Sequence, residues 1–188
     1  ATYTNDGMLV NWRWLATDPD DIAFNIYRDG TKLNTLPLSS RTNYLDAEGS
    51  VNSNYTVEAL SAGKVVETAV ALVLEKGYLN IPLDRPQGGT VQGSSYTYTP
   101  GDASVGDVDG DGEYEIILKW DPTNQCDNGQ NGSQNYTGNV YLDCYKLNGT
   151  KLWRIDLGVN IRAGAHYTQF MVYDLDGDVK AEVACKTA

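Results

Sequence analysis

The sequence predicts an all-β fold that begins with a small β-sandwich and continues into the first one to two blades of a β-propeller. Apolar and polar residues alternate over short runs through residues 1–76, which is typical of half-buried strands. Residues 107–115, with the sequence DVDGDGEYE, recur 67 positions later (174 − 107) as residues 174–182, DLDGDVKAE. Each copy leads directly into an apolar run, so the second half of the chain contains a repeated β unit.

Residues 1–78 carry the signals of the sandwich. Turn-forming sequences at 28–31 and 47–49 separate the predicted strands. The pattern indicates a sandwich of fibronectin type III character, followed by a Pro- and Gly-rich linker over 79–94. The alternating apolar positions that predict the strands are Val10, Trp12 and Trp14, then Phe24 and Ile26, then Tyr55, Val57 and Ala59, then residues 64–74.

Residues 95–188 predict a partial propeller. A short strand before Asp107, a strand over 113–120, and a hairpin with arms 139–147 and 151–157 make four strands, the number in one blade. Asn148-Gly149 is the strongest hairpin signal of the chain. Residues 166–173 would open the next blade. Because a propeller closes with about four to eight blades, we expect further blades, in the same or a cleaved chain, to cover the edge at 186–188.

Composition limits the possible partners. The net charge of −11 excludes nucleic acid, and it would repel an acidic substrate unless bound cations or a local basic patch reverse the sign. The longest apolar run, residues 69–74, is too short to span a membrane. A chain starting at Ala1 fits a processed, secreted protein.

Three cysteines allow at most one internal disulfide. Cys126 and Cys144 are the favoured pair, and free thiols are the alternative. Cys185 falls at a core-strand position and is expected to be a buried small apolar residue.

The repeated acidic segments predict calcium (Ca2+) sites. Carboxylates at alternate positions can surround a hard cation that takes about six to eight oxygens. Magnesium fits less well, because it prefers a tight octahedron and retained waters. Gly112 allows the turn that brings the first segment back on itself. The predicted ligands are the side chains of Asp107, Asp109, Asp111 and Glu115 with the carbonyl of Glu113, and in the second copy Asp174, Asp176, Asp178 and Glu182 with Lys180.

An EF-hand and plain acidic surface turns are the two alternatives to this calcium site. An EF-hand requires a glutamate at position 12 and a following helix, but those positions are Leu118 and Cys185 and the following residues predict strands. Plain acidic surface turns would explain one copy more easily than two. Val179 replaces the turn glycine in the second copy, which predicts weaker binding there or a differently shaped turn.

The chain also resembles a known family. Residues 106–122, GDVDGDGEYEIILKWDP, and 160–170, NIRAGAHYTQF, are similar to the N-terminal third of bacterial rhamnogalacturonan lyases that have a calcium-binding, eight-bladed propeller. Residues 23–28 and 152–158 support the resemblance, which departs at Val179. It implies a secreted lyase that cleaves the rhamnogalacturonan I backbone of pectin by β-elimination.

Residues that occur once are the candidates for chemistry, because a repeated feature serves the repeated blade. His166, the only histidine, and Arg162 are the candidate catalytic residues; a structural histidine and a surface salt bridge are the alternatives. Lys119 is expected to be structural, since Lys186 is its counterpart. Asp121, Asn124 and Asn128 lie in a polar loop that would contact sugar hydroxyls, and a solvated connector is the alternative.

The favoured function is therefore the N-terminal part of a polysaccharide lyase, with residues 1–188 inactive alone. The main rival is a non-catalytic, calcium-stabilised module that binds carbohydrate or protein. A third possibility is a nicked piece of an enzyme whose other blades lie in another chain.

Overall fold

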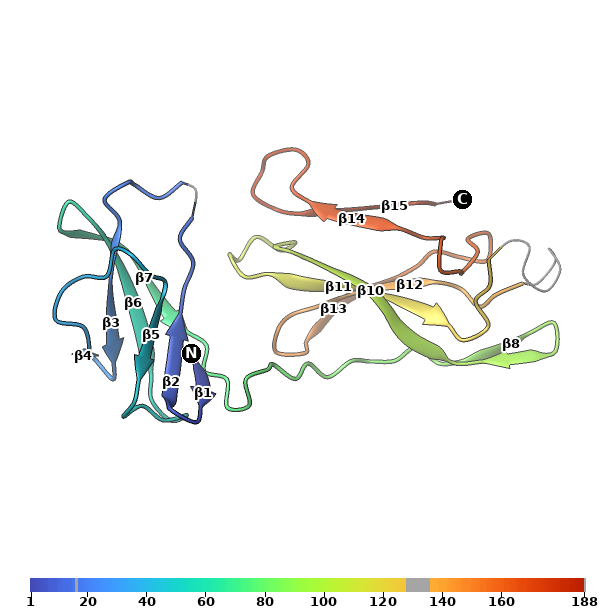
Figure 1. The fold of residues 1–188 in the computed structure, drawn as a ribbon. Helices are drawn as coiled ribbons and strands as arrows, with labels where there is room; N and C mark the ends of the chain where they lie inside the picture. Colours follow the sequence, from blue (N-terminus) through green and yellow to red (C-terminus); the bar gives the residue numbers. More distant parts are fainter. Residues whose placement is uncertain (16, 128–135, 188) are drawn as a thin grey trace. The chain divides into compact units, whose positions relative to one another are not determined.

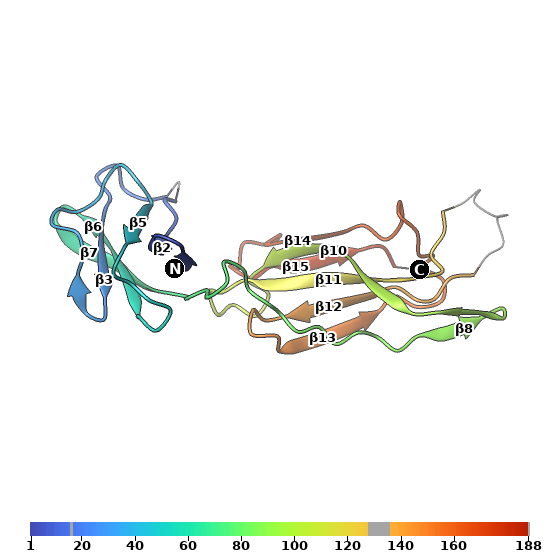
Figure 2. The same cartoon turned by 60° about the horizontal axis from the view of Figure 1, so that its bottom comes forward.

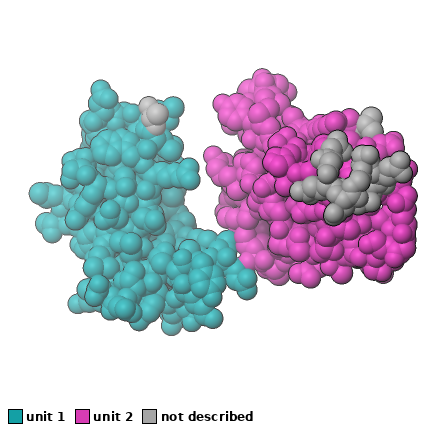
Figure 3. Space-filling model, turned by 45° about the vertical axis from the view of Figure 1, so that its right-hand side comes forward, with its two compact units in different colours: residues 1–80 teal, residues 81–188 magenta. Residues whose placement is uncertain are grey.

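The computed structural model describes residues 1–15, 17–127 and 136–187. Every regular element in this part of the chain is a β-strand, and the ladders between strands are antiparallel, which confirms the all-β prediction. No helix long and apolar enough to cross a membrane occurs among these residues. The chain divides into two compact units, Ala1–Asn80 and Ile81–Ala188 (Figure 3).

Unit 1 contains two sheets. The first has the order β1-β2-β5 and the second has the order β4-β3-β6-β7. The strands are β1 (Thr2–Thr4), β2 (Gly7–Asn11), β3 (Ala23–Arg28), β4 (Thr31–Lys32), β5 (Asn43–Asp46), β6 (Tyr55–Ser61) and β7 (Lys64–Ala71), as Figure 1 shows.

Alternate residues of the two sheets form one core. Met8 and Val10 of β2 and Ile26 of β3 are 0% exposed, and Phe24 and Val57 pack in the same cluster. Burying a side chain of this size contributes about 1.5–3 kcal/mol, so the alternation in β2 and at the start of β6 favours the observed register. Unit 1 is a β-sandwich held by this core.

The strand predicted around Val10, Trp12 and Trp14 is shorter than expected. Its last backbone hydrogen bond to the neighbouring strand segment is donated by the Trp12 amide to the carbonyl of Thr42, just before β5, at 3.1 Å. The chain then turns, because the side chain of Asp18 accepts a hydrogen bond from the backbone of Leu15 at 2.7 Å. The Asp18 carboxylate thus accepts an amide that would otherwise bond to a neighbouring strand, and β2 ends at Asn11.

The first sheet of unit 2 has the order β10-β11-β12-β13 (Figure 2). The predicted hairpin forms at Asn148-Gly149, with Gly149 at φ +87° and the Thr150 amide donating to the Asn148 side chain. Buried aromatic side chains, including Tyr98 and Trp120, pack on this sheet. Its strands are β10 (Tyr98–Gly106), β11 (Glu115–Pro122), β12 (Tyr141–Tyr145) and β13 (Lys151–Asp156).

The second sheet of unit 2 repeats the start of the first. It pairs β14 (Phe170–Tyr173) with β15 (Glu182–Cys185), so the first strand of this sheet starts after His166 rather than at it. Strand β14 lies beside β10 (Figures 1 and 2). The pairs Tyr173–Glu182, Val172–Val183, Met171–Ala184 and Phe170–Cys185 reproduce the pairs Gly106–Glu115, Val105–Ile116, Ser104–Ile117 and Ala103–Leu118.

Gly106 allows the two sheets to approach each other. A Cβ atom at this position would lie 2.7 Å from the side chain of Ala181 and 2.8 Å from that of Val172. The Ala181 amide also donates to the carbonyl of Asp107 at 2.6 Å. The backbone of the first repeat therefore contacts the second repeat directly, which a larger residue at 106 would prevent.

The expected linker over 79–94 is partly structured. Strands β8 (Gly89–Val91) and β9 (Ser94–Tyr96) form a hairpin within and just beyond it. Gln92 and Gly93 both have positive φ, at 47° and 79°, as a tight hairpin turn requires. The glycines and prolines of this stretch had masked the strand signal.

The predicted pairing of Cys126 with Cys144 is wrong, because all three cysteines are free. Cys144 pairs with Ile117 in the middle of the sheet, whereas Cys126 lies in the loop beyond the end of β11. Three residues of β12 separate Cys144 from that end of the sheet, or about 10 Å, more than the roughly 7 Å that a disulfide spans between Cα atoms. Cys185 is half-buried rather than buried.

Candidate functional site

Residues 107–115 form the first loop and residues 174–182 form the second loop, and the two share one hydrogen-bond pattern. Asp107 holds the first loop, because its oxygens accept the amides of Gly110 and Gly112 at 2.6 and 2.9 Å. The other bonds of the first loop also recur in the second, where the donor–acceptor pairs are Leu175–Glu182, Gly177–Asp174, Asp178–Asp176, Val179–Asp174 and Lys180–Asp178. The two loops therefore make the same turn.

Each loop gathers three carboxylates. The structure brings together Asp107, Asp109 and Glu115 in the first loop and Asp174, Asp176 and Glu182 in the second, with oxygens within 4.8 Å of one another. This spacing suits a cation about 2.3–2.6 Å from each oxygen. Asp111 and Asp178 are outside these groups, and accept hydrogen bonds from the backbone of Glu113 and Lys180 at 2.8 and 2.9 Å.

Val179 occupies the position that Gly112 holds in the first loop. Gly112 has φ +88° and Val179 has φ +74°, which is in the left-handed region that β-branched residues avoid. The alternative of a differently shaped second turn is wrong, because Val179 takes the glycine conformation and keeps its amide on Asp174 at 3.0 Å. The second loop therefore stores backbone strain that the first loop does not.

Lys146 supplies a positive charge to the first loop. Its Nζ atom lies 2.6 Å from Asp109, 2.6 Å from Asp111 and 3.9 Å from the buried Glu115. The hydrogen bonds to the two aspartates raise the pKa of Lys146, and the same contact lowers the pKa of Asp111. In the described part of the chain, no carboxylate of the second loop forms an ion pair. The carboxylates of the first loop thus already attract one positive charge, the ammonium group of Lys146.

Arg162 binds the polar loop that follows β11 through Cys126. Its Nε donates to the carbonyl of Cys126 at 2.9 Å, and its Nη2 contacts the Cys126 sulfur at 3.2 Å. The Cys126 amide donates to the carbonyl of Ala163 at 3.0 Å. Arg162 takes part in none of the ion pairs between described residues, so it holds two loops together instead of forming a surface salt bridge.

Asn124 and Asn128 were predicted to contact sugar. The Asn124 side chain accepts a hydrogen bond from the amide of Gly138 at 3.0 Å, so it closes the loop on itself. Asn128 lies outside the described residues.

His166 is exposed and oriented by Asp127. The imidazole is 83% exposed, and its Nδ1 lies 2.5 Å from a carboxylate oxygen of Asp127. The other oxygen of Asp127 accepts the His166 backbone amide at 3.3 Å. The hydrogen bond with the ring lowers the pKa of Asp127. A carboxylate on Nδ1 fixes the ring and leaves Nε2 to exchange a proton or bind a metal.

Asp121 lies in a buried charged cluster at the end of β11. Lys119 is 2% exposed, and its Nζ lies 2.7 Å from Asp102 and 3.8 Å from Asp121. Burial raises the pKa of Asp121, the nearby Asp102 charge adds to this effect, and Lys119 opposes it. Lys119 is thus a buried ion-pair partner of Asp102 and Asp121. The carboxylate of Asp121 is only slightly exposed, with 12% of its side chain accessible.

Two residues of this region were missed from the sequence. Asp127 lies in the predicted polar loop, but its partner is 39 positions away, at a separation that no local pattern reveals. Lys146 lies two residues before Asn148, in the same turn, and in sequence it resembles any exposed lysine. Both contacts depend on the pairing of strands distant along the chain.

Residues 78–188 match the family described as rhamnogalacturonan lyase family 11, C-terminal domain. The chain belongs to rhamnogalacturonan lyase family 11. Residues 1–73 match a second description, the rhamnogalacturonan I lyases beta-sheet domain. The family 11 match includes both acidic loops, His166 and Arg162.

Relatives in family 11 are similar over the whole chain. Rhamnogalacturonan endolyase YesW of Bacillus subtilis (strain 168) is 60% identical over 190 residues, and rhamnogalacturonan exolyase YesX of the same organism is 55% identical. These alignments cover 100% of this chain but 30% and 31% of the relatives. The chain therefore spans less than a third of the length of these curated relatives.

Solved structures of family 11 share the fold. The crystal structure of YesX has a TM-score of 0.93 at 54% identity, and the structure titled Bacillus licheniformis rhamnogalacturonan lyase PL11 has a TM-score of 0.92 at 56% identity. Each match covers 100% of this chain and 31% or 32% of the other chain. The arrangement of strands described above is thus that of the start of these lyases.

Proposed function

We propose that this chain is the N-terminal part of a secreted lyase that cleaves the rhamnogalacturonan I backbone of pectin by calcium-dependent β-elimination. The observation that carries the proposal is the 60% identity with a rhamnogalacturonan endolyase along the entire chain. Secretion follows from the substrate, because an intact polysaccharide does not cross a cell membrane.

The donor sets of the two loops support calcium as the metal. The three carboxylates of each loop are hard oxygen donors, and the first loop already holds an ammonium group against its aspartates. Asp107, Asp109 and Glu115 would hold one ion, and Asp174, Asp176 and Glu182 the other. Because the device is repeated with the sheet that carries it, we assign these ions a structural role.

The architecture belongs to the same proposal. The two-sheet sandwich of unit 1 supports a fibronectin type III-like domain, and the repeated register of unit 2 supports successive propeller blades. Further blades would then complete the substrate cleft.

The reaction makes specific demands on the site. A base removes the C5 proton of galacturonate, the C4–O bond breaks, a C4=C5 double bond forms, and the leaving oxygen gains a proton. The uronate carboxylate must be neutralised so that the developing enolate is stabilised. In this chain, His166 is the group best arranged to exchange that proton, because Asp127 fixes its ring and its surface is open.

The test is to follow the absorbance of the conjugated uronide product on rhamnogalacturonan I with the full-length protein, first in calcium and then in chelator. We expect turnover in calcium, and little or none from residues 1–188 alone. Failure of the full-length protein to generate the absorbance would sink the enzyme proposal. Wild-type turnover by the 188-residue chain would show that the missing blades are unnecessary.

A further inference from the structure

Unit 1 contains a hollow of about 250 Å³ at one end of its sandwich. The floor is formed by inward-facing residues of β3, β6 and β7, where Phe24 pairs with Ala59 and Val57 pairs with Ala69. The other wall is the non-strand segment that follows β2. The hollow therefore lies where one sheet continues and the opposite sheet has stopped at Asn11.

Small side chains create this space. Ala59, which is half-buried, and Ala69, which is exposed, pair with Phe24 and Val57 and line the hollow, which larger apolar residues at these positions would fill. Above them, Trp12 packs on Phe24 with ring centroids 5.4 Å apart, and Trp14 meets the same ring at 6.4 Å. The hollow thus has an apolar floor and an aromatic wall.

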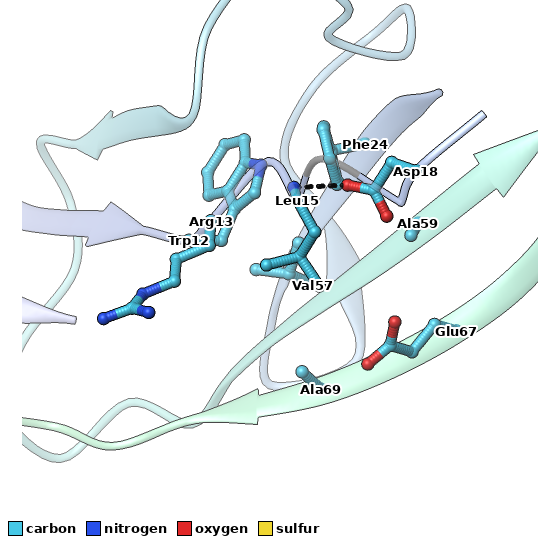
Figure 4. Close-up of a pocket in the computed structure, with 9 residues that line it drawn as sticks. All are labelled: Trp12, Arg13, Leu15, Asp18, Phe24, Val57, Ala59, Glu67 and Ala69. Carbon is cyan, nitrogen blue, oxygen red and sulfur yellow. Dashed lines mark hydrogen bonds between the residues drawn. The ribbon is translucent and has the colours of Figure 1, made fainter. Parts of the chain in front are cut away.

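Trp12 also carries an unused donor. Its indole Nε1 is the one buried side-chain nitrogen or oxygen without a hydrogen-bond partner among the residues that the structure describes. Leu15, which is 48% exposed, lies beside the indole in the hollow (Figure 4). If the Leu15 side chain moved aside, the indole N–H of Trp12 could donate a hydrogen bond to an acceptor on a ligand. Buried donors are normally paired, so an orphan beside a hollow points to an acceptor supplied from outside.

Charged groups of opposite sign line the hollow. Arg13 extends to one side, and Asp18 and Glu67 lie on the other (Figure 4). Neither Arg13 nor Glu67 forms an ion pair or hydrogen bond with the described residues, and Asp18 uses only one oxygen, on the Leu15 amide. A guanidinium selects a carboxylate, and free carboxylates accept hydrogen bonds from hydroxyl groups.

We propose that this hollow is a carbohydrate-binding site for a deoxyhexose joined to a uronate. The volume is below the roughly 300–1,000 Å³ of pockets for drug-sized ligands, so it holds one sugar ring. The methyl group of the deoxyhexose contacts the alanine floor, its hydroxyls meet Asp18 and Glu67, and the neighbouring uronate carboxylate meets Arg13. The choice of sugars rests on the proposed function, whereas the residues of the site all belong to unit 1.

The test uses the whole 188-residue chain and an alternating rhamnose–galacturonate tetrasaccharide, in chelator so that no metal-dependent step intervenes. The indole N–H signal of Trp12 in a ¹⁵N NMR titration reports on the hollow directly. We expect it to shift saturably, and we expect Ala69→Leu, which fills the floor, to weaken binding by about tenfold or more. Arg13→Gln should weaken binding of this tetrasaccharide by about fivefold.

Val70→Leu is the matched control, because Val70 is the next residue of β7 and is 79% exposed. It should bind as the wild type does, and thermal unfolding should show Ala69→Leu folded with unchanged or higher stability. An unmoved Trp12 signal, or unchanged affinity in Ala69→Leu, would overturn the site. Equal affinity for an oligogalacturonate would overturn the assignment of the deoxyhexose.

The two proposals fail separately. Turnover by the full-length protein with no Trp12 response in the 188-residue chain would reject the carbohydrate site alone. A saturable, Ala69-dependent Trp12 shift without turnover by the full-length protein would reject the lyase alone.

Discussion

Val179 adopts φ +74° at the position where Gly112, in the preceding repeat, adopts φ +88°. The hydrogen bonds around the two residues are the same, so the second loop keeps the turn although its sequence opposes it. The positive φ strains the backbone of Val179, and the Val179 side chain, which is 80% exposed, gains little from packing in return.

Val179→Gly should stabilise the protein by about 1 kcal/mol, since relief of a strained φ exceeds the extra entropy of an unfolded glycine. Urea unfolding measures the change. Gly112→Val is the matched control and should destabilise by about 1–2 kcal/mol. A destabilising Val179→Gly would mean that the valine side chain contributes packing that its exposure does not indicate.

Lys146→Gln should have opposite consequences with and without metal. In chelator it removes the ammonium that pairs with Asp109 and Asp111, so the melting temperature should fall by about 1–3 °C. In calcium the same change removes a competitor for these carboxylates, so the calcium affinity of the first loop should rise. Calorimetric titration and melting curves measure both effects. The same loss of stability in both conditions would contradict competition.

Asp109→Ala should remove calcium-dependent stability. At calcium concentrations about 100 times Kd, binding to the folded state contributes about 2.7 kcal/mol, so the variant should melt earlier in calcium and much less so in chelator. Glu113→Gln is the control, because the Glu113 side chain is outside the carboxylate group and the position contributes its backbone. An equal loss in both media would argue against a metal at this loop.

Asp127→Asn should make stability less dependent on acid pH. The His166 ring lowers the folded-state pKa of Asp127 below its ordinary 3.8, so the contribution of this pair is complete above 3.8 and is lost as the pH falls through the lowered value. The variant should therefore be less stable than the wild type at about pH 7 and closer to it at about pH 3. In the full-length protein, Asp127→Asn and His166→Gln should both lower kcat. Wild-type kcat in His166→Gln would assign the pair a structural role.

The cysteines should behave as three thiols of different reactivity. Burial raises the pKa of Cys144 to about 12, so this thiol should resist alkylation at about pH 8 while the protein is folded. Cys126 and Cys185 are half-buried and should react faster. Mass spectrometry should count three alkylated sites after unfolding without reductant. A single alkylated cysteine would instead show that two of the three cysteines form a disulfide.

Local signals in the sequence were sufficient for the elements whose structure depends on neighbours in the chain. Asn148-Gly149 forms the predicted hairpin because glycine accepts positive φ there, and the acidic repeat folds twice because the same side chains meet the same amides. Val179 shows the limit of this reasoning. A local preference worth about 1–3 kcal/mol yielded to the other hydrogen bonds of the loop.

Contacts between distant segments could not be predicted. Asp127 meets His166, and Arg162 meets Cys126, only because strands β11 to β14 bring their loops to one end of the sheet. The strand around Trp12 ends early for a local reason instead, since the nearby side chain of Asp18 accepts a hydrogen bond from the Leu15 amide. The alternation of apolar and polar residues predicts which segments form strands, but it does not predict the residue at which each strand ends.

The shared register of β10–β11 and β14–β15 limits where this chain can change in length. Inserting one residue into any of these strands would exchange its inward and outward faces and would separate Glu115 or Glu182 from the aspartates of its own loop. Insertions should be tolerated best in exposed turns outside the ladders, such as residues 158–160, where Val159 is 82% exposed. Differences in length among such lyases should therefore accumulate in such exposed turns, while the acidic loops and the segment around His166 keep their spacing.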